Sequence, residues 1–85
     1  MIMKFKIMLV SITSANVRSN KATFNTNIPI SYDIIEVGKL LREYYHAPKL
    51  TLTQNFTTGY YSFSKFIDID NITTVPVEVE LDLYD

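Results

Sequence analysis

The chain has 85 residues, of which 47% are hydrophobic, 20% are charged and none is cysteine, and its formal net charge is −1. This length fits one domain spanning residues 1–85, and the hydrophobic fraction excludes a disordered chain. The lack of cysteine excludes disulfide bonds, thiolate zinc sites and a cysteine nucleophile. Because a core this small is only marginally stable, the sequence is about equally compatible with a monomer and a homodimer.

The first 30 residues predict two strands. Phe5, Ile7 and Leu9 alternate with Lys4 and Lys6, and the apolar residues that follow occupy both faces, as in an interior strand: Met8, Val10 and Ile12. Residues 14–21 are rich in Ser and Asn and predict a loop. Residues 22–30 alternate again, with four apolar residues on one face: Ala22, Phe24, Ile28 and Ile30. Pro29 cannot donate a ladder hydrogen bond, so this strand either ends there or lies at an edge.

A change of hydrophobic period after residue 30 predicts one amphipathic helix. Ser31 is the expected N-cap, and Pro48 is expected to stop the helix near His46. One stripe of the helix is apolar: Ile34, Val37, Leu41, Tyr44 and Tyr45. Gly38 is expected to let the helix lie close to the sheet.

Three further strands follow the helix. Residues 49–57 alternate, with Leu50, Leu52 and Phe56 on the apolar face, and a TTG turn follows. Residues 60–70 place Tyr61, Phe63, Ile67 and Ile69 on the apolar face. In the last strand five apolar residues are expected to face inward: Val75, Val77, Val79, Leu81 and Leu83. The predicted fold class is α+β, a single mainly antiparallel five-stranded sheet with one helix packed on one face, in the order ββαβββ.

The residues that catalysis would require are scarce, so we expect no enzyme, no cofactor and no metal site. The only histidine, His46, is expected at an exposed helix end without a nucleophile beside it. Asp68 and Asp70 lie on one strand face, but no other ligand converges on them, so they are interpreted as solvated acids.

The end of the chain, VEVELDLYD, places Glu78, Glu80 and Asp82 on one strand face at intervals of about 6.8 Å, close to two phosphate steps of a nucleic-acid strand. Such a row can imitate a phosphate backbone, and Asp68 and Asp70 would add to it if the last two strands pair. The same alternation is also typical of the wet face of an ordinary antiparallel strand. Three aromatic residues are expected on the same exposed sheet face, where a protein partner would cover them: Tyr60, Phe66 and Tyr84.

Charge is distributed unevenly, because residues 1–27 carry +4 and residues 50–85 carry −5. This asymmetry marks either a charged partner or two parts of the chain that lie side by side. The basic residues near the start of the chain suggest an alternative site, a patch that binds nucleic acid. It would be formed by Lys4, Lys6, Arg18 and Lys21.

The expected function is a small non-enzymatic protein-interaction module. Its narrower form is an inhibitor or regulator of a basic, nucleic-acid-processing enzyme, of viral or mobile-element type, that acts through the acidic strand. The alternatives are a structural or assembly subunit of a larger homo-oligomer or virion, and a weak nucleic-acid-binding domain. No apolar run approaches the length of about 18 residues that a membrane helix needs, so we expect a cytoplasmic protein without a membrane partner.

Overall fold

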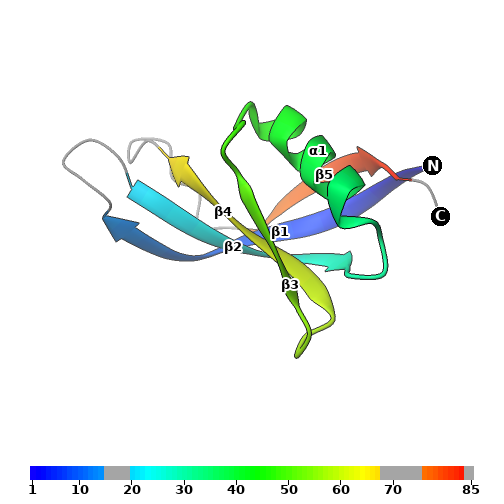
Figure 1. Cartoon of the computed structure of the whole chain (residues 1–85), viewed down its shortest axis with the longest axis horizontal. Helices are drawn as coiled ribbons and strands as arrows, with labels where there is room; N and C mark the ends of the chain where they lie inside the picture. Colours follow the sequence, from blue (N-terminus) through cyan, green and yellow to red (C-terminus); the bar gives the residue numbers. More distant parts are fainter. Residues whose placement is uncertain (15–19, 68–75, 84–85) are drawn as a thin grey trace.

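The computed structural model describes residues 1–14, 20–67 and 76–83. Along the chain these residues form β1 (Ile2–Ser14), β2 (Asn20–Pro29), α1 (Ile34–Tyr45), β3 (Thr51–Asn55), β4 (Tyr60–Ile67) and β5 (Val77–Asp82) (Figure 1). The predicted order ββαβββ is confirmed. The centre of the predicted loop between the first two strands, residues 15–19, lies outside the described residues.

The strands form one antiparallel sheet in the order β3-β4-β2-β1-β5. β1 has β2 on one side and β5 on the other, which confirms the prediction of an interior strand. β5 lies beside β1 and not beside β4, so the suggested pairing of the last two strands is wrong. The helix crosses one face of the sheet, which we call the inner face, and the opposite face is the outer face (Figure 1).

The core lies between the inner face and α1. Two helix residues, Val37 and Leu41, pack against side chains from all five strands or the residues next to them: Phe5, Ile7, Ile28, Leu50, Tyr61, Phe63, Val79, Leu81 and Leu83. These positions follow the alternation in the sequence because successive side chains of a strand point to opposite faces. Phe56 was expected on the same face, but it lies in the turn after β3 and is 79% exposed.

A β-bulge in β1 explains why the middle of this strand is apolar on both faces. Leu9 pairs with Phe24 and Ser11 pairs with Thr23, so Val10 has no residue opposite it. The extra residue returns Ile12 to the face of Leu9, and it leaves Val10 exposed beside Met8. The apolar residues of β1 therefore do not all contribute to the core.

A second irregularity lies where β2 approaches its end at Pro29, as predicted. Between Asn25 and Pro29 the register with β4 shifts. The hydroxyl of the buried Thr26 donates to the carbonyl of Tyr61 at 2.6 Å and accepts from the amide of Ile28 at 3.1 Å. One side chain thus replaces the backbone hydrogen bonds that the irregular ladder loses.

The N-cap of the helix lies two residues after Ser31. Asp33 is the N-cap, and its carboxylate accepts hydrogen bonds from the amides of Ile35 and Glu36. The helix ends at Tyr45, and His46 follows in the left-handed conformation with φ 51°. The end predicted from Pro48 is therefore confirmed, and the predicted N-cap is wrong.

The atoms nearest to a Cβ added at Gly38 belong to a side chain of the same helix, whereas the sequence pointed to the sheet. A Cβ at this position would lie 3.1 Å from Nη1 of Arg42. The Nε of Arg42 donates to the carbonyl of Leu50 at 3.1 Å, just before β3 begins. Arg42 therefore attaches the start of β3 to the helix.

Candidate functional site

The outer face carries large apolar side chains that no part of the core uses. Met8, Val10, Tyr60 and Phe66 are each between 42% and 54% exposed. They belong to β1 and β4, which are separated by β2, so they border a strip of the sheet that is two strand spacings wide, about 10 Å. We call these four residues the apolar frame. The sequence predicted that Tyr60 and Phe66 would be exposed here, and this is confirmed.

The strip inside the frame is polar and bears short side chains. Residues on neighbouring strands lie opposite one another across it, with Thr23 between Ser64 and Ser11, and Asn25 between Ser62 and Met8. Short hydroxyl and amide side chains leave the backbone of the sheet close to the surface. The outer face therefore has a central strip of short polar side chains with larger apolar side chains on both sides of it.

The acidic row lies on β5 at one margin of the sheet, and its side chains are exposed as predicted. The strand register places Glu78 opposite Lys6 and Glu80 opposite Lys4 on β1. Asp82 accepts a hydrogen bond from the ammonium group of Met1 at 2.8 Å. The row therefore borders a row of positive groups, and the two oppositely charged parts of the chain lie side by side.

The other predicted site residues are not gathered with this row. Lys21 lies on β2 between Phe66 and Thr13, nine residues along β1 from Lys4, or about 30 Å. The structure thus does not bring the basic residues Lys4, Lys6 and Lys21 into one patch. Four predicted residues lie outside the described part of the chain: Arg18, Asp68, Asp70 and Tyr84.

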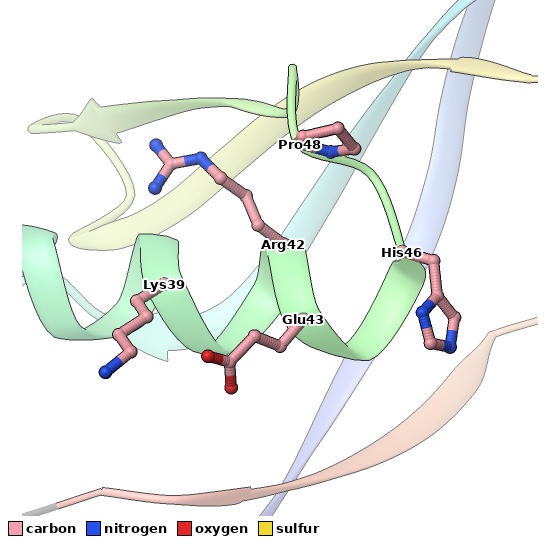
Figure 2. Close-up of a pocket in the computed structure, with 5 residues that line it drawn as sticks. All are labelled: Lys39, Arg42, Glu43, His46 and Pro48. Atoms are coloured by element: carbon pink, nitrogen blue, oxygen red, sulfur yellow. The ribbon is translucent and has the colours of Figure 1, made fainter.

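An open hollow of about 430 Å³ lies at the end of α1, lined by Lys39, Arg42, Glu43, His46 and Pro48. Figure 2 shows that the guanidinium of Arg42 lies on one side of the helix while the other charged side chains extend the opposite way. Their functional groups do not converge on one point. His46 is exposed, as predicted. Glu43 and the negative end of the helix dipole offset the charges of Lys39 and Arg42, so the hollow offers no strong field for an anion.

Lys65 occupies a position that the sequence pattern did not identify. It follows Tyr61 and Phe63 on the inner face, and its ammonium lies 4.9 Å from the ring centre of Tyr45 and 5.7 Å from that of Phe24. Burial lowers the pKa of Lys65. Burial also raises the pKa of Tyr45 to about 12, with a smaller contribution from the neighbouring Tyr44. The alternation in residues 61–67 could have indicated this lysine, because it alone is charged among the inward positions.

Within residues 1–14, 20–67 and 76–83, no three or more side chains of His, Asp or Glu are grouped so that they could hold a metal ion. The single helix of this part of the chain is too short and too polar to cross a membrane.

The chain matches no model of a protein family, and neither a curated protein sequence nor a solved structure shows significant similarity to it.

Proposed function

We propose that this chain is a non-enzymatic protein-interaction module that binds a partner protein through the outer face of its sheet. The observation that carries the proposal is the apolar frame, because Met8, Val10, Tyr60 and Phe66 are exposed although the core on the inner face is complete without them. Aromatic residues and methionine are enriched where proteins bind each other, and exposed apolar patches mark such surfaces.

The surroundings of the frame indicate the chemistry of the partner. A projecting segment with a polar tip and apolar sides would fit between β1 and β4, because the tip can bond the short hydroxyl and amide side chains while the sides bury the frame. The charged residues nearby carry both signs, with Lys21 beside Phe66 and the paired rows of β1 and β5 beyond Met8. A partner with a polar centre, apolar groups on both sides of it and a rim of mixed charge is therefore the best match.

The proposal is tested by comparing three baits in a quantitative pull-down from a lysate. The double variant Met8→Ser, Phe66→Ser removes apolar area from the frame, whereas the control Ile35→Ser removes it from the helix, where Ile35 is 76% exposed. We expect a specific set of proteins to be retained by the wild type and by the control but lost from the double variant. If all three baits retain the same proteins, the outer face is not the binding surface.

A second candidate is favoured by the exposure of Glu78, Glu80 and Asp82 along one margin strand. In this form the partner is a basic nucleic-acid-processing enzyme, which the chain inhibits or regulates by presenting carboxylates in place of phosphates. Lys4 and Lys6 lie beside the row and reduce its negative field, so this candidate ranks second.

The second candidate is tested with neutral variants, since lysines at these positions would face Lys4 and Lys6. Glu78→Gln, Glu80→Gln and Asp82→Asn together should abolish a salt-sensitive complex with a basic protein and leave the thermal midpoint nearly unchanged. A complex that survives these substitutions and is insensitive to salt would exclude phosphate imitation.

A further inference from the structure

The two margins of the sheet are protected to different degrees. β5 carries an acid at three of its six positions, and like charges on such an edge oppose pairing with another strand. β3, with the sequence TLTQN, has no charge, proline or glycine, and its register with β4 is continuous from Thr51 to Asn55. β3 is therefore a regular, uncharged edge strand of the kind that accepts a further strand.

The backbone of β3 offers a defined set of hydrogen-bonding groups at this margin. The amide of Leu50 donates to Ala47 and its carbonyl accepts from Arg42, so both groups of Leu50 point away from β4. Alternate residues of a strand direct their backbone groups to the same side, so Leu52 and Gln54 direct theirs away from β4 as well. Within the described chain β3 has no neighbour on that side. Two amides and two carbonyls are thus available for another strand.

We propose that β3 pairs with β3 of a second copy of this chain, antiparallel and about a two-fold axis at Thr53, to form a homodimer with one continuous sheet. This register places Leu52 of each copy opposite Gln54 of the other. Each of these two pairs exchanges two hydrogen bonds, so both amides and both carbonyls of every copy are satisfied. Thr53 meets its own counterpart on the outer face, and cross-strand threonine pairs are favourable.

Charge and closure favour a second copy over a foreign strand. Two positive groups lie near this margin: the Arg42 guanidinium, bonded to the carbonyl of Leu50 three positions from the axis, and Lys49, four positions from it. The two copies of each group would lie about 20 Å or more apart, well beyond the screening length of about 8 Å. The pairing uses the β3 margin of both copies and leaves only the two acidic β5 margins outside. The assembly therefore closes at two chains, and the ten strands of their described residues are near the upper size of a twisted open sheet.

The exposure of Phe56 supports the same register. This residue follows β3 directly and is 79% exposed, which is unusual for a phenylalanine. Phe56 is three positions beyond the axis, so in the dimer it would lie beside Leu50 of the second copy, three positions before the axis. Leu50 belongs to the core. The dimer thus covers an aromatic ring that the single chain leaves in water. The interface remains small, so association should be weak and depend on concentration.

The proposal is tested by sedimentation velocity over a wide range of protein concentration, on the wild type and on charged variants at the axis. We expect the wild type to shift from monomer to dimer as its concentration rises. Thr53→Lys and Thr53→Glu should each dimerise several-fold more weakly, because like charges meet at the axis, and an equimolar mixture of the two should associate at least as well as the wild type. Asn25→Lys adds the same charge on the outer face of an interior strand and should dimerise normally.

A backbone variant supplies an independent check. Gln54→Pro removes an amide that faces the second copy but none that bonds β4, so it should abolish dimerisation while the fold persists. The proposal is wrong if the wild type stays monomeric at every concentration, or if the mixture of Thr53 variants associates no better than each variant alone. These outcomes are independent of the apolar frame, which the pull-down tests separately.

Discussion

Replacing Thr26 by valine would remove one hydroxyl from the core while keeping the shape of the side chain. The hydroxyl donates a buried hydrogen bond to the carbonyl of Tyr61 and accepts another from the amide of Ile28. A buried backbone group without a partner costs about 1–3 kcal/mol, so the loss of both partners should lower the free energy of unfolding by about 2–6 kcal/mol. This is a large part of the about 5–15 kcal/mol by which small domains are stable.

The control is Thr26→Ser, which keeps both hydrogen bonds and loses one methyl group, at a cost of about 1 kcal/mol. Urea unfolding followed by circular dichroism gives both free energies if the slope with denaturant stays unchanged. Serine should therefore be tolerated better than valine at this buried position, which is the reverse of what apolar burial alone would give. If the valine variant equals or exceeds the serine variant in stability, the hydroxyl does not hold the irregular end of β2.

Three further predictions concern the helix. Asp33→Ala should lower the free energy of unfolding by about 1 kcal/mol in urea titrations because it removes the N-cap, whereas Ser31→Ala should change it little; equal effects would restore Ser31 as the cap. Gly38→Ala gains up to about 1 kcal/mol of helix propensity, but in the wild type the new Cβ crowds the Arg42 guanidinium. The gain should therefore be larger in an Arg42→Ala background, and strict additivity in a double-mutant cycle would contradict the contact. The pKa of Tyr45 is raised from 10 to about 12 in the folded chain, so stability that is complete below pH 10 is lost as the pH rises toward 12. Tyr45→Phe should flatten this fall in the thermal midpoint, and an unchanged profile would show that another group is responsible.

Alternation along each strand was sufficient to predict which side chains face the core. Phe5, Ile7, Phe63, Val79 and Leu81 are buried as expected, because a strand with one apolar face has only one way to hide it. The helix was equally accessible from its period, apart from the exact position of its first turn. Local patterns determine faces because they act between residues that are adjacent in sequence.

The order of the strands was not predictable in the same way. Alternation indicates which face of β5 is buried but not which strand lies beside it, and the sequence left open whether β5 pairs with β4. The charges contained usable information: Lys4 and Lys6 have the same spacing as Glu78 and Glu80, and the two pairs lie opposite each other. The uneven charge along the chain was compatible with this arrangement and with a charged partner alike.

Two site features also depended on details that a pattern cannot supply. The bulge at Val10 shifts the register by one residue, and only the pairing with β2 reveals that it leaves Val10 exposed beside Met8. Lys65 is tolerated on the inner face because its ammonium lies over two aromatic rings, one of which belongs to the helix. Both features arise from contacts between distant segments, so they emerge only with the tertiary structure.

The pairing of β1 with β5 has a consequence for how the chain is made. Ile7 lies opposite Val77, so β1 leaves the ribosome about 70 residues before its second neighbour exists. The β3–β4 hairpin involves only near neighbours and can form early, whereas closing β1 against β5 requires a contact between distant segments and is slow. During synthesis Phe5 and Ile7 therefore lack their packing partners Val79 and Leu81 until those residues have been made. A nascent chain stalled before residue 76 would be a target for chaperones.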